Sequence, residues 1–245
     1  MDLESMKSEA FNLEKEDQLL SFVLEKFGQE VFTPGFDRIL PLFQSAMNYS
    51  QKKQFKVVTI GGTNGKGQTA HTLCDLLSSE KINVALWTSP HILSIKERFV
   101  FSSHGQTEQV SYEELDMTFQ SVDQDLKEHF PDLKISFYEF LFLVFWKLVM
   151  KRDDIDVVIL EVGLGGRLDA VNLFDAHVAA ICSISRDHQA ILGNRYDLIL
   201  SEKLPIARKG HKLITNFKLN YLNELTKKYC QAQGVLWENL SLIHI

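Results

Sequence analysis

Short runs of continuous apolar residues alternate along the chain with longer stretches in which apolar residues recur every three or four positions. The run IDVVILEV at 155–162 is typical of a parallel strand that is covered on both faces, and FKVVTI at 55–60 has the same character. Apolar residues between 70 and 77 follow the spacing of a helix that packs along one face. The alternation predicts an α/β fold, with a doubly wound, mostly parallel sheet and helices on both faces.

The remaining segments extend this alternation. Helices are predicted at 17–27, 36–49, 113–129, 138–150, 196–207 and 219–232, and further strands at 83–88, 177–184 and 212–215. The stretch FVFSSHGQTEQ at 99–109 is expected to be an exposed hairpin or loop. The most apolar run, 140–149, is too short to span a bilayer and contains Lys147, which favours a buried helix.

Composition excludes several classes of partner. The 245 residues are 45% hydrophobic and 24% charged, with a net charge of −6 and no basic stripe, so a nucleic-acid partner is not expected. The acidic N-terminus has no apolar signal sequence. Cys74, Cys182 and Cys230 lie too far apart to form a CxxC metal site. We therefore expect a cytoplasmic protein that does not bind membranes.

The segment GGTNGKG at 61–67 joins a predicted strand to a predicted helix. Glycines let backbone N–H groups approach an anion, the helix N-terminus adds partial positive charge, and Lys66 can reach the β- and γ-phosphates. Because Ile60 and Gly67 depart from a strict Walker A motif, a merely glycine-rich turn is the alternative. The predicted ATP-binding residues are Gly62, Thr63, Asn64, Gly65, Lys66, Gly67, Gln68 and Thr69.

An ordered set of motifs then points to one family. GTNGKG resembles the ATP loop of the Mur-ligase-like superfamily of ATP-dependent amide ligases. It is followed by WTSPHI at 87–92, KERF at 96–99, ISFYEF at 135–140, VVILEVGLGGRLDAVN at 157–172 and DHQAILG at 187–193. Together these segments resemble bacterial folylpolyglutamate synthase, which is often bifunctional with dihydrofolate synthase activity. The resemblance covers about residues 32–234. It implies a monomeric enzyme that uses ATP and Mg²⁺ to join L-glutamate to folate or dihydropteroate through an acyl phosphate.

Candidate metal ligands follow the predicted strands. Glu161 ends the strongest strand, where ligands bind in open α/β sheets, and a carboxylate there suits Mg²⁺. Ser89 and His188 follow two other strands, although each alone would be an ordinary turn or hydrogen-bonding residue. The resemblance implies that Ser89, Glu161 and His188 together hold a magnesium ion.

The resemblance also implies catalytic and substrate-binding residues. Lys203 matches a lysine that is carbamylated in the superfamily, although EKLPI replaces the usual EKAGI and a solvated helix lysine is the alternative. The expected catalytic residues are Lys66, His188 and Lys203. The expected substrate-binding residues are Phe36, Arg38, Pro90, Arg98, Glu139, Arg167 and Asp169. Arg167 and Asp169 could instead pair with each other, and the segment TPGFDRI at 33–39 could simply begin a helix.

Two positions depart from the family pattern. Gln68 stands where a Ser or Thr usually offers Mg²⁺ a hydroxyl, with Thr69 as the nearest substitute, and Arg186 stands where the family usually has an apolar residue. These departures keep two alternatives open: another Mur-like amide ligase, or a nucleotide-binding fragment with weak turnover.

The ending ENLSLIHI is unusual, because the chain stops where another strand would be expected after a helix. We expect residues 1–239 to form an ATP-binding, Mur-ligase-like domain and residues 240–245 to be a non-native or frayed tail. The C-terminal glutamate-ligase domain of the family is expected to be absent, which predicts nucleotide binding with poor turnover.

Overall fold

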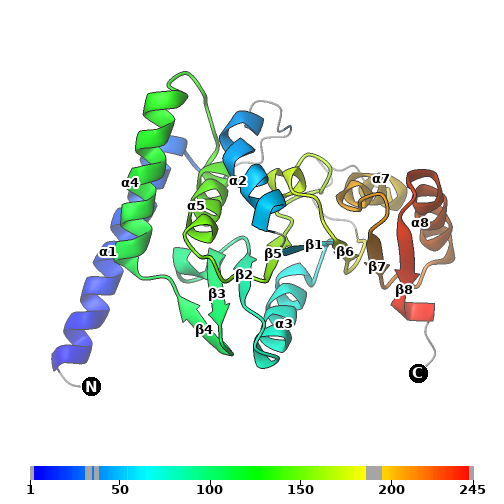
Figure 1. The fold of residues 1–245 in the computed structure, drawn as a ribbon, viewed down its shortest axis with the longest axis horizontal. Helices are drawn as coiled ribbons and strands as arrows, with labels where there is room; N and C mark the ends of the chain where they lie inside the picture. Colours follow the sequence, from blue (N-terminus) through cyan, green and yellow to red (C-terminus); the bar gives the residue numbers. More distant parts are fainter. Residues whose placement is uncertain (1–2, 31–34, 36–38, 54, 186–194, 243–245) are drawn as a thin grey trace.

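The computed structural model describes residues 3–30, 35, 39–53, 55–185 and 195–242. Within them an eight-stranded sheet has the order β4-β3-β2-β5-β1-β6-β7-β8 (Figure 1). The strands are β1 (Lys56–Gly61), β2 (Val84–Trp87), β3 (Phe99–Ser103), β4 (Gln106–Gln109), β5 (Val157–Glu161), β6 (Val178–Ile181), β7 (Lys212–Thr215) and β8 (Leu236–Asn239). The helices are α1 (Leu3–Phe27), α2 (Leu40–Lys53), α3 (Lys66–Ser79), α4 (Tyr112–His129), α5 (Phe137–Met150), α7 (Tyr196–Lys203) and α8 (Asn220–Gln233). The predicted α/β class with a mostly parallel sheet is confirmed.

The strand order places a topological switch point at the centre of the sheet. β1 lies between β5 and β6 and is parallel to both, and β2 and β7 continue the parallel sheet on either side. Strands β2 and β5 therefore lie on one side of β1 and β6 and β7 on the other, so the direction in which strands are added reverses at β1. Because Ile60 is paired with Glu161 and Gly61 with Ile181, the loops that follow β1, β5 and β6 leave the sheet side by side.

Alternate residues of the central strands enter two separate cores. On β2 and β5, Val84, Leu86, Val157 and Ile159 pack with α3, whereas the intervening residues join the larger core formed with α5. All of β2 and β5 is buried. Figure 1 shows α3 on one face of the sheet and α2 and α5 on the other. This burial on both faces explains the continuous apolar character of these strands.

Helix α5 is apolar on nearly every side because it lies between other elements rather than at the surface. It contacts β2 as well as α1, α2 and α4. Its aromatic residues continue into the segment after β5, where the rings of Trp146 and Phe174 stack with centroids 3.9 Å apart. The buried-helix interpretation of this stretch is therefore confirmed, and no helix in the described part of the chain could span a bilayer.

Several boundaries differ from the sequence prediction. Helix α1 begins at Leu3 rather than 17, and α7 ends at Lys203 because Pro205 cannot donate the next helical hydrogen bond. The predicted exposed hairpin at 99–109 does form, but only β4 is exposed; in β3, Phe99 and Phe101 are buried.

The expectation that the chain stops short of a strand after its last helix is wrong, because β8 is present there and pairs with β7. Its sequence LWEN is short and half-exposed, so neither alternation nor a continuous apolar run marks it. Residues Leu240–Leu242 follow as a short 3-10 helix, in which the Ser241 hydroxyl donates a hydrogen bond to the Phe217 carbonyl. Residues 243–245 lie outside the described part, so the division of the chain at 239 stays a prediction.

Candidate active site

The glycine-rich loop connects β1 directly to α3, as its sequence predicts. Gly65 has a φ of 83° and immediately precedes the helix, and Gly62 has a φ of 141°. A Cβ atom at Gly62 would lie 3.1 Å from the backbone nitrogens of Cys182 and Ser183, so only glycine fits this approach. The loop therefore presents backbone and the N-terminus of a fourteen-residue helix at the carboxyl edge of the sheet.

Two serines after β6 hold the loop in place. The Ser183 hydroxyl accepts a hydrogen bond from the Asn64 amide and donates one to the Asn64 carbonyl, both at 2.9 Å. The Thr63 hydroxyl donates to the Ser185 carbonyl at 3.2 Å and accepts from the Ser185 amide at 3.1 Å. Sequence reasoning missed Ser183 and Ser185; the available signal was their position directly after a strand of the same sheet.

Lys66 starts the helix and is half-buried, with its ammonium donating to the Thr63 carbonyl at 3.3 Å. Gln68 and Thr69 are exposed on the first turn. The Thr69 hydroxyl donates to the Gly65 carbonyl at 2.7 Å and accepts a weak hydrogen bond from the Cys182 thiol at 3.3 Å. The Thr69 hydroxyl is therefore already hydrogen-bonded to Gly65 and Cys182.

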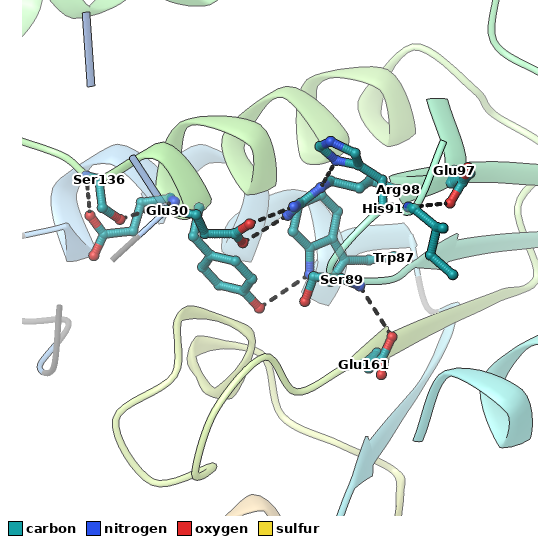
Figure 2. A network of polar contacts seen from close by, with 11 residues as sticks. Glu30, Trp87, Ser89, His91, Glu97, Arg98, Ser136 and Glu161 are labelled. Carbon is teal, nitrogen blue, oxygen red and sulfur yellow. Dashed lines mark hydrogen bonds and ion pairs between the residues drawn. The ribbon is translucent and has the colours of Figure 1, made fainter. Parts of the chain in front are cut away.

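Glu161, at the carboxyl end of β5, lies under the first turn of α3. Its side chain is buried, and its Oε2 accepts the backbone N–H of Ser89 at 3.1 Å (Figure 2). A Cβ atom on Gly67 would lie 3.4 Å from both carboxylate oxygens. Burial raises the pKa of Glu161, and the Ser89 amide and the charge of Lys66 partly oppose that rise.

The chemistry of these groups fits a magnesium ion. Mg²⁺ prefers oxygen ligands and in nucleotide sites usually takes one or two carboxylates together with phosphate oxygens and water. Among the described residues, only the Ser89 amide donates a hydrogen bond to the Glu161 carboxylate. No cluster of three metal-ligating side chains occurs in the described ranges, and His188 lies outside them.

Asp169 holds the glycine-rich turn that follows β5. Its buried carboxylate accepts the amides of Gly163, Leu164 and Val171 at 2.9, 3.1 and 3.0 Å. The Tyr138 hydroxyl also donates to it at 3.0 Å. Burial raises the pKa of Asp169, and these hydrogen bonds limit the rise.

The suggested pairing of Arg167 with Asp169 is wrong. The Arg167 guanidinium forms an ion pair with Glu202 at 2.9 Å, and the Arg167 amide donates to the Glu202 carbonyl. Arg167 is exposed whereas Asp169 is buried, so the turn separates the two side chains. Arg167 instead fastens this turn to α7.

Lys203 is buried at the end of α7, which excludes the alternative of a solvated helix lysine. Its ammonium donates to the carbonyls of Gly62 at 3.0 Å and Gly165 at 3.5 Å. Lys203 therefore joins the phosphate loop to the turn after β5, two segments that are far apart in sequence.

Arg98 lies in a separate polar network beside Ser89 (Figure 2). It is 1% exposed; its two terminal nitrogens contact the Glu30 carboxylate at 3.0 and 2.6 Å, and its Nε donates to His91 Nδ1 at 2.8 Å. Burial and the charge of Arg98 lower the pKa of His91. Glu30, which sequence reasoning missed, attaches the residues after α1 to this network.

The other expected substrate residues are placed less centrally. The Glu139 carboxylate accepts the Ser136 amide at 2.7 Å and so caps the start of α5. Pro90 is exposed directly after Ser89, to which it is joined by a cis peptide bond. Phe36, Arg38 and Arg186 lie outside the described residues. The structure thus brings Lys66, Ser89, Glu161 and Lys203 to one edge of the sheet.

Comparisons with known proteins agree with the motif order. The dihydrofolate synthase/folylpolyglutamate synthase of Haemophilus influenzae is 36% identical over 179 residues, which are 72% of this chain and 39% of that protein. The Escherichia coli protein of the same name is 37% identical over 187 residues, 76% of this chain and 41% of that protein. The chain spans about two fifths of the length of these curated relatives.

Solved structures give the same result. The bifunctional folylpolyglutamate synthase/dihydrofolate synthase from Yersinia pestis, complexed with AMPPNP and a manganese ion, matches with a TM-score of 0.74 and 30% identity. The match covers 91% of this chain and 51% of that one. No protein-family model matches the chain. Over the residues that match, the chain belongs to the dihydrofolate synthase/folylpolyglutamate synthase family.

Proposed function

We propose that the chain provides the ATP site of a ligase that joins L-glutamate to folate or dihydropteroate. The observation that carries the proposal is the buried Glu161 carboxylate lying directly under the phosphate loop, with Gly67 against both of its oxygens. A buried carboxylate beside a loop of the phosphate-binding type supports a cation site at this position. The similarity to dihydrofolate synthase/folylpolyglutamate synthases supports the substrate class.

In the proposed reaction, an oxygen of the substrate carboxylate attacks the γ-phosphorus of ATP, and ADP leaves. The glutamate nitrogen then attacks the carbonyl carbon of the acyl phosphate, releasing phosphate and a proton. Lys66 would exchange its contact with the Thr63 carbonyl for the β- and γ-phosphates, stabilising the charge that develops on the transferred group. Glu161, Ser89 and His188 would hold the magnesium ion, which supplies electrostatic stabilisation and alignment.

The remaining residues would shape the site. Lys203 would bridge the phosphate loop and the turn after β5, as a free ammonium or as a carbamate. Asp169 would fix that turn, and Phe36, Arg38, Pro90, Arg98, Glu139 and Arg167 would contribute to substrate binding. The proposal also includes a cytoplasmic location and a monomeric state. Light scattering of the purified protein measures its molar mass and so tests the monomeric state.

The test measures nucleotide binding and turnover separately. Calorimetry with AMPPNP should show binding that needs Mg²⁺ and is weakened in Glu161→Gln. Phosphate release from ATP should require both L-glutamate and either folate or dihydropteroate. Absence of Mg²⁺-dependent nucleotide binding would refute the ATP site. Release that is independent of the pteridine substrate but requires another carboxylate would assign the chain to a different amide ligase.

A second candidate is a nucleotide-binding chain with weak turnover. It is favoured by the first turn of α3, where Gly67 and Gln68 offer no hydroxyl and the Thr69 hydroxyl already bonds to the Gly65 carbonyl. Tight AMPPNP binding without substrate-dependent phosphate release would select this candidate. Replacing Gln68 with Ser should then raise turnover if the missing hydroxyl is the cause.

A further inference from the structure

A cavity lies at the amino edge of the sheet, away from the phosphate loop. Its volume is about 340 Å³, within the roughly 300–1,000 Å³ range of small-molecule sites. It is bounded by the end of α2, the start of β1 and the segments before β6 and β7. Because Lys56 begins β1 and Gly61 ends it, the cavity and the phosphate loop are roughly 16 Å apart.

One part of the cavity lining is basic. Lys56, His177 and His211 all line it, and the two imidazole rings lie 5.2 Å apart. No carboxylate among the described residues pairs with the Lys56 ammonium. The lining carboxylate of Asp175 is already paired with Arg208 at 2.5 Å. The cavity therefore offers positive charge that the described chain does not neutralise.

The backbone fixes which nitrogen of His177 can donate. Its Nδ1 accepts the Val57 amide at 3.1 Å, so a neutral His177 carries its proton on Nε2. Burial and the neighbouring charge of Lys56 lower the pKa of His177, which favours this neutral form. His177 thus offers an N–H donor next to the Lys56 ammonium without needing to be charged itself.

Besides Ser50 and Gln51 of α2, the rest of the lining is apolar and partly aromatic. Met47, Phe55, Leu173 and Phe174 contribute to it. The Phe174 ring stacks on Trp146, at a centroid distance of 3.9 Å, and is itself almost fully buried. An apolar group in the cavity would therefore contact aromatic residues that the core holds rigidly.

We propose that this amino-edge cavity binds a small aromatic carboxylate. Its carboxylate lies toward Lys56 and the two imidazoles, and its ring lies against Phe55 and Phe174. A small set of polar donors beside an apolar wall is the usual composition of a ligand site. The site is separate from the proposed ATP site, and its existence does not depend on the ligase assignment.

The test uses benzoate as the probe and histidine ring signals in NMR spectra as the readout. Benzoate should shift the His177 and His211 signals saturably, with benzamide and acetate binding at least about 10-fold more weakly because each lacks one half of the recognition. Lys56→Gln should weaken benzoate binding about 10-fold or more. Lys52→Gln is the matched control, since Lys52 is exposed on the last turn of α2 and does not line the cavity.

The following outcomes would overturn the proposal: no saturable shift, equal binding of benzamide or acetate, or equal weakening by Lys56→Gln and Lys52→Gln. Competition by saturating Mg²⁺-ATP would also overturn it, because it would place benzoate at the phosphate loop. Circular dichroism checks that each variant folds. If Lys56→Gln does not fold, His211→Gln provides the same test with the same expected loss.

Discussion

Replacing Asp169 with Asn tests whether this residue acts chiefly by fixing the conformation of the turn after β5. The carboxylate accepts three buried amides and the Tyr138 hydroxyl. An Asn side chain has one acceptor oxygen, which can serve Gly163 and Leu164 while the Tyr138 hydroxyl turns to accept from the new NH₂ group. The Val171 amide then has no partner, at a cost of about 1–3 kcal/mol.

The retained hydrogen bonds also lose their charge-assisted character. Because burial raises the pKa of Asp169, relief from burying a charge outweighs that loss, and the Val171 amide left without a partner is the main cost. We therefore expect Asp169→Asn to lower the free energy of unfolding by about 1–2 kcal/mol, or the melting temperature by roughly 2–8 °C. Urea unfolding followed by circular dichroism measures this change.

The matched control is Asp75→Asn, which makes the same chemical change on the exposed face of α3. It should alter stability by less than about 0.5 kcal/mol. Equal stability of the two variants would refute the role of Asp169 in fixing the turn after β5. A loss of substrate binding by Asp169→Asn at unchanged stability would instead assign Asp169 directly to the substrate.

The difference in the free energy of unfolding between wild type and Asp169→Asn should change with pH in a definite direction. A folded-state pKa above the usual 3.8 means that the folded chain holds the Asp169 proton more tightly than the unfolded chain. This contribution to stability is fully present below about pH 3.8 and is lost as the pH rises through the raised pKa. Urea unfolding should therefore show that the free energy of unfolding of wild type exceeds that of Asp169→Asn by more near pH 3.8 than at neutral pH.

Three further predictions concern the nucleotide site and the thiols. Lys66→Met should weaken AMPPNP binding about 10- to 150-fold in calorimetry, because it removes a charge-assisted contact to phosphate; unchanged affinity would contradict the assigned role. Glu161→Gln should melt at a higher temperature than wild type at pH 7 without nucleotide, since burial raises the Glu161 pKa and its ionisation opposes folding, and a lower melting temperature would contradict this. Because burial raises the pKa of both Cys74 and Cys230 to about 11, a thiol reagent at pH 8 should react first with Cys182; a fast phase that survives Cys182→Ser would refute it.

The sequence predicted those parts of the fold that depend on local pattern. The continuous apolar run of β5 and the glycine loop before α3 both carry their signal within a few residues. Strand β8 was not recognised because its four residues lie at the edge of the sheet, where burial does not constrain them to an apolar pattern. The helix predicted at 196–207 includes Pro205, and the observed α7 ends before this residue.

The candidate site was predictable in its strand-end residues and not in its long-range contacts. Glu161 and Ser89 could be placed together because parallel strands end at one edge. The Arg98–Glu30 pair spans 68 residues and the Thr63–Ser185 pair spans 122, and neither leaves a periodic trace in the sequence. The packing of the tertiary structure, rather than any local motif, selects these partners.

The hydrogen bonds from Ser183 and Ser185 have a consequence for ligand affinity. They fix Thr63 and Asn64 through hydrogen bonds within the chain itself, so conformational entropy of the loop is lost during folding rather than during association. Residues whose observed contacts are with the loop can therefore contribute to the dissociation constant of the nucleotide. This preorganisation would add to the affinity that the phosphate contacts themselves provide.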